Sequence, residues 1–144
     1  MKSSELLINK IIEFEGCKLK AYKCPAGIWT IGVGHTKGVK QGQIITKEQA
    51  MTLLRGDLLP CENYVNNLGV CKTQGEFDSI VDFVFNLGTA ALGRSTLLKY
   101  IRQGREEQYI RDEFAKWVNS KGVRLKGLVI RRAWEADRYF SKES

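Results

Sequence analysis

The chain has a single histidine, His35, and none of its four cysteines forms a CxxC pair. A structural zinc site needs several Cys or His ligands at short spacings, so we expect no metal site, and no motif implies a cofactor. Only two prolines occur among 144 residues, and neither a repeat nor a low-complexity segment is visible. With 43% hydrophobic and 27% charged residues, the composition is typical of a soluble globular chain of one domain, residues 1–144.

Long apolar runs are also missing. The apolar residues near the amino terminus are interrupted by Asn9, Lys10 and Glu13, which excludes the core of a signal peptide or a membrane anchor there. We therefore expect no membrane insertion. If the protein acts outside the cytoplasm, another agent must release it or an export segment is missing. No oligomerisation signal is visible, so a monomer is expected.

Acidic residues are fewer than basic ones, 16 against 23, which gives a net charge of +7. Such a surplus favours encounters with polyanions but does not choose among nucleic acid, anionic lipid and an acidic wall polymer, and it could be merely solubilising. The basic residues are scattered along the chain, and no nucleic-acid-binding module is recognisable. No nucleic acid partner is expected.

The cysteines leave two alternatives open. Cys61 and Cys71 enclose a short loop and could form a disulfide under oxidising conditions, or they could be two free thiols in a reducing cytoplasm. A pairing of Cys24 with Cys17 is a further possibility.

Helical spacing of apolar residues predicts a first helix that begins after Ser3 or Ser4 and ends at about Phe14, before Gly16. From Leu19 to His35 the pattern changes to glycine, aromatic and β-branched residues, which predicts a β-hairpin or a three-stranded sheet.

Two capping boxes open the next helices. Thr46 to Gln49 starts a helical run with Pro60 inside it, where we expect a kink or a break, and Thr73 to Glu76 starts an apolar helix that ends at Gly88. Three further helical patterns cover Thr96 to Ile101, Glu106 to Trp117 and Leu128 to Tyr139.

These elements predict a mainly helical α+β fold of two lobes. The lobes are a small β-containing N-terminal lobe at about 14–45, a linking helix at about 46–67, and a helical C-terminal lobe at about 73–140 on which the first helix packs. A cleft between two lobes would suit a polymer substrate.

The segment from Phe14 to Thr36 reads FEGCKLKAYKCPAGIWTIGVGHT. It resembles the signature of the phage-type lysozymes, or endolysins, of glycoside hydrolase family 24, the T-even phage type. That family has a Glu at the end of its first helix, usually an Asp nine positions later and a Thr six positions beyond. Glu15, Cys24 and Thr30 stand at these positions.

The resemblance continues along essentially the whole chain. It includes the start of the linking helix at Ile45, the block from Phe85 to Gly88, the block from Arg94 to Leu98, and the last block from Gly127 to Glu135. It implies the lysozyme-like fold and a muramidase that cleaves the β-1,4 bond between N-acetylmuramic acid and N-acetylglucosamine in bacterial peptidoglycan.

Glycoside hydrolysis needs a proton donor for the leaving oxygen and a second group on the other face of the sugar. Glu15 suits the donor, since partial burial at the helix end beside Phe14 could raise its pKa. Cys24 replaces the usual Asp, and some members of the family look like natural Glu/Cys/Thr variants. A thiolate at Cys24, with Lys23 beside it, could activate water or act as a nucleophile, while Thr30 positions the water.

Further roles are implied only by the resemblance. Substrate-binding positions would be Tyr22, Gly34 and Asn86. His35 would pair with Asp57 in a structural role, and Arg131 or Arg132 would approach Glu15 or its neighbours.

Several alternatives stay open. Inversion is expected if Cys24 and Thr30 handle a water, which needs carboxyl-type groups about 6.5 to 9.5 Å apart, and a separation of about 5 Å would favour retention. The chain could also be a catalytically impaired peptidoglycan-binding relative, or a cysteine peptidase using Cys24 and His35. For a phage enzyme of this family, the resemblance suggests accumulation in the host bacterial cytoplasm until lysis, and then action on the cell wall.

Overall fold

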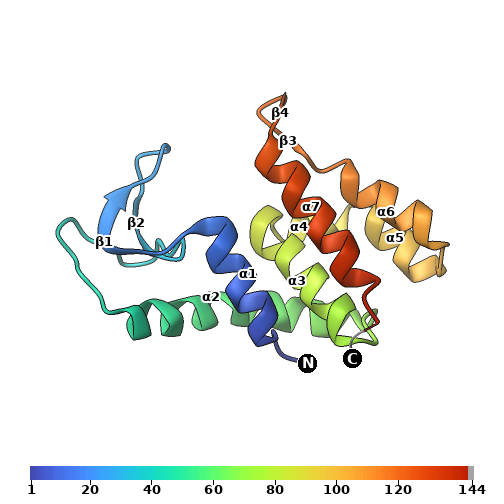
Figure 1. Ribbon diagram of the computed structural model, residues 1–144, viewed down its shortest axis with the longest axis horizontal. Helices are drawn as coiled ribbons and strands as arrows, with labels where there is room; N and C mark the ends of the chain where they lie inside the picture. Colours follow the sequence, from blue (N-terminus) through green and yellow to red (C-terminus); the bar gives the residue numbers. More distant parts are fainter. Residues whose placement is uncertain (143–144) are drawn as a thin grey trace. The chain divides into compact units, whose positions relative to one another are not determined.

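A computed structural model describes residues 1–142 and is mainly helical, as predicted (Figure 1). Seven helices and two small two-stranded antiparallel sheets follow one another along the described residues. Their order is α1 (Glu5–Glu15), β1 (Lys18–Lys23), β2 (Trp29–Gly32), α2 (Lys47–Leu68), α3 (Gln74–Leu87), α4 (Thr89–Gly93), α5 (Thr96–Gln103), α6 (Glu107–Ala115), β3 (Asn119–Ser120), β4 (Val123–Arg124) and α7 (Lys126–Tyr139).

The chain divides into two compact units. One consists of Met1–Leu7 and Cys61–Ser144, and the other of Ile8–Pro60. The second unit holds the predicted catalytic segment. The predicted limits of the lobes stay a prediction.

The first helix begins and ends as its sequence indicates. The hydroxyl oxygen of Ser4 accepts a hydrogen bond from the backbone N–H of Leu7 at 3.1 Å, so Ser4 caps the helix. At the other end, Gly16 adopts a φ of 76° and its N–H donates to the carbonyl oxygen of Ile12 at 2.7 Å. A left-handed backbone favours glycine, and this turn leaves Glu15 as the last helical residue.

β1 and β2 form an antiparallel hairpin in the unit Ile8–Pro60. Tyr22 lies opposite Thr30 and Lys23 opposite Trp29, with an irregular register between Lys18 and Tyr22. A third short segment joins β1 through a bridge from Ile44 to Lys20. The predicted choice between a hairpin and three strands therefore resolves as a hairpin with one additional bridged segment.

α2 carries the predicted capping box. The side chain of Thr46 accepts from the N–H of Gln49 at 3.1 Å, and the side chain of Gln49 accepts from the N–H of Thr46 at 2.8 Å. The predicted break at Pro60 is wrong, because one helix runs through it. A helix tolerates the loss of the bond to Gly56, four residues earlier, when its apolar side chains are buried, as Leu58 and Val65 are.

In the other unit, α3 is buried along most of its length and packs against α7. Phe83 of α3 is central, with the rings of Phe114 and Trp117 at 6.2 and 5.4 Å in edge-to-face contacts. Thr73 caps α3 as predicted by accepting from the N–H of Glu76. The carboxylate of Glu76 accepts from Lys72 rather than Thr73, one residue earlier than a standard capping box.

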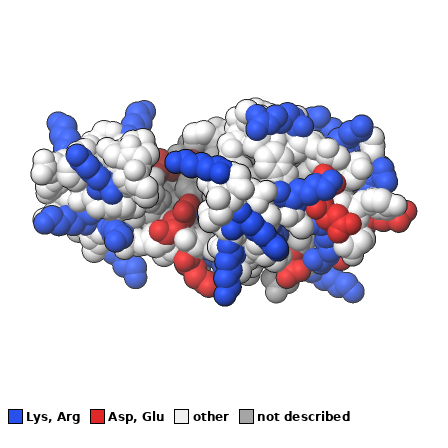
Figure 2. Space-filling model, turned by 90° about the horizontal axis from the view of Figure 1, so that it is seen from above, with Lys and Arg blue, Asp and Glu red and all other residues white. Residues whose placement is uncertain are grey.

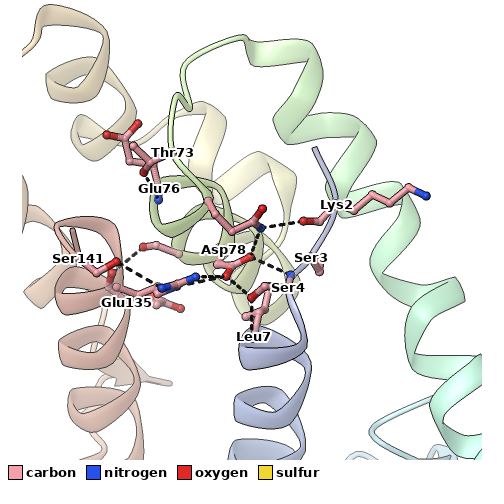
Figure 3. A network of polar contacts seen from close by, with 12 residues as sticks. Lys2, Ser3, Ser4, Leu7, Thr73, Glu76, Asp78, Glu135 and Ser141 are labelled. Atoms are coloured by element: carbon pink, nitrogen blue, oxygen red, sulfur yellow. Dashed lines mark hydrogen bonds and ion pairs between the residues drawn. The ribbon is translucent and has the colours of Figure 1, made fainter. Parts of the chain in front are cut away.

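The amino-terminal segment is attached to this helical unit through Asp78 (Figure 3). The hydroxyl and the backbone N–H of Ser4 both donate to its carboxylate, and the guanidinium of Arg138 on α7 binds the same group at 2.8 Å. Asp78 is fully buried, so these donors replace the water that its charge loses.

Two elements were not predicted. The five-residue helix α4 and the β3–β4 hairpin are too short to show a hydrophobic period. α6 is also shorter than the predicted stretch from Glu106 to Trp117, because Lys116 and Trp117 already close its last turn by bonds to Glu113 and Phe114.

Candidate functional site

Cys24 lies at the start of a tight turn between β1 and β2. Its backbone N–H donates to the carbonyl oxygen of Ile28 at 2.9 Å, and its own carbonyl accepts from Gly27 at 2.8 Å. Gly27 has a φ of 81°, so the turn needs glycine there. The turn fixes the backbone of Cys24 while leaving its side chain only partly covered.

The turn also lowers the pKa of the Cys24 thiol. Hydrogen bonding from the backbone of Ile28 is the largest cause, and it outweighs the opposing effect of burial. Further hydrogen bonds from the backbone of Ala26 and the hydroxyl of Thr30 act in the same direction. Donors aimed at sulfur favour the thiolate, which is the nucleophilic and proton-accepting form. The expected help from Lys23 is not among these causes.

Thr30 lies on β2, and its side chain is turned toward the same turn. The residue is only 4% exposed, and its hydroxyl donates to the carbonyl oxygen of Ile28 at 3.0 Å. The hydroxyl has one proton, so it can donate either to this carbonyl or to the sulfur of Cys24. Its lone pairs can accept a hydrogen bond from water. The structure thus brings Cys24 and Thr30 together.

Tyr22 extends this group, because cross-strand partners place their side chains on one face of a sheet and Tyr22 lies opposite Thr30. Its half-buried ring also lies 5.2 Å from the Nζ of Lys18. Gly34, the other β-lobe position implied for substrate binding, is exposed and has a φ of 73° in the turn after β2.

Glu15 is exposed at the carboxyl end of α1. The structure therefore does not show the partial burial expected for it from the sequence. Phe14 beside it is half-buried, with the Nζ of Lys10 at 5.2 Å from its ring. The helix end thus presents the Glu15 carboxyl group on the surface of its unit.

His35 is fixed by two partners. Its Nδ1 lies 2.8 Å from the Oδ2 of Asp57, and its Nε2 lies 2.9 Å from the carbonyl oxygen of Lys37. The pair that the resemblance implies is therefore present, and it ties the turn after β2 to α2. Because both ring nitrogens contact acceptors other than Cys24, the geometry does not support the cysteine peptidase alternative.

Asn86 and Arg131 lie in the helical unit, in contacts between α3 and α7. Arg131 donates two hydrogen bonds to the fully buried carboxylate of Asp82, at 2.9 and 2.7 Å. The Oδ1 of the half-buried Asn86 accepts from Arg132 at 2.6 Å, and Arg132 also lies 2.9 Å from Glu135. Sequence reasoning named both arginines but missed the acceptor Asp82, whose place on α3 gave no local signal.

These buried groups shift one another's ionisation. Burial raises the pKa of Glu135 well above its usual value, and a hydrogen bond with Asp82 raises it further. Although burial opposes it, hydrogen bonds from Glu135 and Arg131 hold the pKa of Asp82 below its usual value. The opposite directions of the two shifts favour a proton on Glu135 rather than on Asp82.

All four cysteines are free thiols. Burial, with a smaller effect of the nearby Glu76 charge, raises the pKa of Cys71 to about 12, which makes that thiol unreactive.

Among the described residues, no three His, Cys, Asp or Glu side chains are grouped to hold a metal ion. In residues 1–142, no helix has the length and apolar character needed to cross a membrane.

Comparison with known proteins adds independent evidence. Residues 12–135 match a family model described as phage lysozyme. An endolysin of Acyrthosiphon pisum secondary endosymbiont phage 1 is 41% identical over 94% of this chain and 95% of its own length. An endolysin of Bacillus phage PZA is 42% identical over 94% of this chain, which spans only 54% of that relative. Among solved structures, the muramidase domain of SpmX from Asticaccaulis excentricus superimposes with a TM-score of 0.88 at 36% identity, over 97% of this chain and 98% of that one.

Proposed function

Because the chain belongs to the phage lysozyme family and is a lysozyme-type enzyme, we propose that it hydrolyses the β-1,4 bond between N-acetylmuramic acid and N-acetylglucosamine in bacterial peptidoglycan. In this proposal Glu15 is the general acid, and Cys24 with Thr30 handles the attacking water. The observation that carries it is the Cys24 turn, whose donors stabilise a thiolate beside the Thr30 hydroxyl.

The proposed step conserves protons. Glu15 gives its proton to the glycosidic oxygen as the bond to the anomeric carbon breaks. A water held by the Thr30 hydroxyl attacks that carbon and loses a proton to the Cys24 thiolate. Exchange with solvent then returns a proton to Glu15 and removes one from the Cys24 thiol. A water on the opposite face of the sugar gives inversion at the anomeric carbon.

Three supporting roles complete the proposal. Tyr22, whose side chain shares a sheet face with Thr30, contacts the sugar, and Gly34 and Asn86 bind substrate in the positions that the resemblance implies. The His35–Asp57 pair holds the turn after β2 to α2. We further propose that the protein is a monomer, that it needs no nucleic acid partner, and that it stays in the host cytoplasm until lysis gives it access to the wall.

The test measures turbidity loss of permeabilised bacterial cells and the mass of the released fragments. We expect wild type to release muropeptides with new reducing muramic acid ends, and Glu15→Gln to lose about 10²- to 10⁴-fold in rate. Glu13→Gln, at an exposed position of the same helix, is the matched control and should keep wild-type activity. Urea unfolding midpoints confirm that each variant is folded.

The role of the thiol is tested separately. We expect Cys24→Ser to be inactive, because a hydroxyl does not ionise at neutral pH, and Cys24→Asp to be active, because a carboxylate accepts protons. Cys17→Ser, which removes an exposed thiol outside the turn, should match wild type. A well-folded wild type that binds the wall without cleaving it would overturn the proposal in favour of a catalytically impaired peptidoglycan-binding relative.

A further inference from the structure

The net charge of the protein is concentrated in one segment. Residues 16–47 contain six lysines and no aspartate or glutamate. The chain has 23 basic and 16 acidic residues in total, so the remaining 112 residues carry 17 basic and 16 acidic ones. The basic residues are scattered along the chain but the acidic residues are not, and almost the whole surplus of +7 comes from this segment.

These lysines are available to a partner. All six are exposed, and among the described residues none of them is in an ion pair. Figure 2 shows blue side chains spread over the left end of the molecule, where the β1–β2 segment lies, without red atoms among them. Uncompensated ammonium groups on such a surface attract anions and lose this attraction as salt is added. The six are Lys18, Lys20, Lys23, Lys37, Lys40 and Lys47.

Three of these cations, Lys18, Lys20 and Lys23, lie on β1, the strand that carries Tyr22 of the proposed site. The ammonium of Lys18 is 5.2 Å from the ring of Tyr22, whose cross-strand partner is Thr30. Lys20 lies between Lys18 and Tyr22 on β1, and it lies opposite the 71% exposed Ile44. A glycan strand at Thr30 would therefore pass beside positive charges.

We propose that Lys18 and Lys20 form a specificity site for the free carboxylates of the peptide stems of peptidoglycan. This inference rests on the proposed function. Peptidoglycan differs from an uncharged polysaccharide because its muramic acid residues bear peptides with free carboxylates, and an exposed ammonium is a suitable partner for them. The two lysines thus discriminate between substrates by charge, whereas the Cys24 turn supplies the chemistry.

Other polyanions fit these observations less well. A phosphate polymer or nucleic acid would be attracted by all six lysines alike, wherever they lie on the segment. The stems are attached to the glycan strand that the site cleaves, so their carboxylates reach the lysines of β1 first. The position of the charge, and not its amount alone, separates these alternatives.

The test compares two substrates and two double variants. The substrates are purified sacculi and the same sacculi after coupling of their carboxylates to methylamine with a carbodiimide, which converts them to neutral amides. The variants are Lys18→Gln with Lys20→Gln, and the control Lys72→Gln with Lys99→Gln, which removes two exposed charges outside the segment. Initial rates are measured below saturation at low and at 0.3 M salt.

On native sacculi we expect the Lys18/Lys20 variant to be roughly fivefold slower than wild type at low salt, since each of two exposed charge pairs contributes a factor of about two to three. On amidated sacculi the two should be equal, and the control should match wild type on both. An equal loss on both substrates would overturn the inference, because it would mean a role unrelated to carboxylates. An equal loss in the control would overturn it in favour of general charge attraction.

A binding measurement separates this inference from the proposed function. Sedimentation of Glu15→Gln with native and amidated sacculi should show weaker binding to the amidated ones, and the Lys18/Lys20 substitutions should remove that difference. If wild type cleaves neither substrate while this difference persists, the proposed hydrolysis fails and the carboxylate site stands. If wild type cleaves native sacculi but shows no preference for them, the carboxylate site fails alone.

Discussion

The buried pair of Glu135 and Asp82 leads to a prediction about the stability of Glu135→Gln that differs from the one expected if Glu135 only formed an ion pair with Arg132. Glu135 is 0% exposed and lies 2.9 Å from Arg132, which would suggest an ionised carboxylate. Its raised pKa, caused by burial and by the hydrogen bond with Asp82, favours instead the neutral acid. Glu135→Gln keeps the shape and a donor for Asp82, so the substitution should cost under about 1 kcal/mol at pH 4.5.

The proton on Glu135 makes the free energy of unfolding depend on pH, and the size of this dependence can be calculated. Above the unfolded pKa of 4.5 the folded protein still holds a proton on Glu135 that the unfolded chain releases. The stability that depends on this proton is complete below pH 4.5 and falls by about 1.4 kcal/mol per pH unit until the folded pKa is reached. Glutamine does not titrate, so the free energy of unfolding of Glu135→Gln should rise relative to wild type with that slope.

Asp82→Asn should behave in the opposite way. Asp82 is 0% exposed and receives both hydrogen bonds from Arg131, so its loss leaves a buried guanidinium without a carboxylate. Breaking such a pair costs about 3–5 kcal/mol. That is a large part of the roughly 5–15 kcal/mol by which domains are stable, so this variant needs measurement at low temperature.

Urea unfolding between pH 4.5 and 7.5, followed by tryptophan fluorescence, tests both substitutions. Trp117 lies 5.4 Å from Phe83 in the same helical unit and reports on it. Asp137→Asn, on the same helix as Glu135 but at a 74% exposed side chain, is the control and should keep the pH dependence of wild type. A loss of 3 kcal/mol or more in Glu135→Gln at every pH would refute the reasoning and show an ionised Glu135 bound to Arg132.

Three other predictions concern single sites. Iodoacetamide should alkylate Cys24 with a pH midpoint below that of a free thiol, and Thr30→Val should move the midpoint up because one donor to sulfur is lost; an unchanged midpoint would contradict this. Asp57→Asn should lower the free energy of unfolding by about 1–3 kcal/mol, measured by urea, through loss of a charged partner of the histidine. Gly75→Ala should lower the melting temperature at a cost of about 1–3 kcal/mol, because the new methyl group would clash with the backbone carbonyl oxygen of Arg138 on α7, whereas Gly56→Ala in open space should not.

Local elements were largely readable from the sequence. The Ser4 cap, the Gly16 stop and the Thr46 box each depend on residues within one turn, so a short window contains all the information that they need. The break predicted at Pro60 was wrong because the prediction, too, used only a short window of sequence. That window shows the loss of one backbone hydrogen bond, but the burial of Leu58 and its neighbours depends on the whole fold.

The candidate site divides in the same way. The sequence by itself determined that Glu15, Cys24 and Thr30 stand at the spacing typical of a family, and so which family the chain belongs to. It could not show how Cys24 ionises, because the donors to its sulfur come from the path of the turn to Ile28. Nor could it show that Glu15 is exposed, since burial depends on which distant segments cover a side chain.

Electrostatics required the tertiary structure most of all. The sequence gives the number of charges and their order, which is enough to find a segment without acids. Only the fold pairs Arg131 with Asp82 across 49 residues and sets Glu135 beside them in the interior. The energy of a charge depends on its distance to other charges and on the water it loses, and both quantities are fixed only when separate helices pack together.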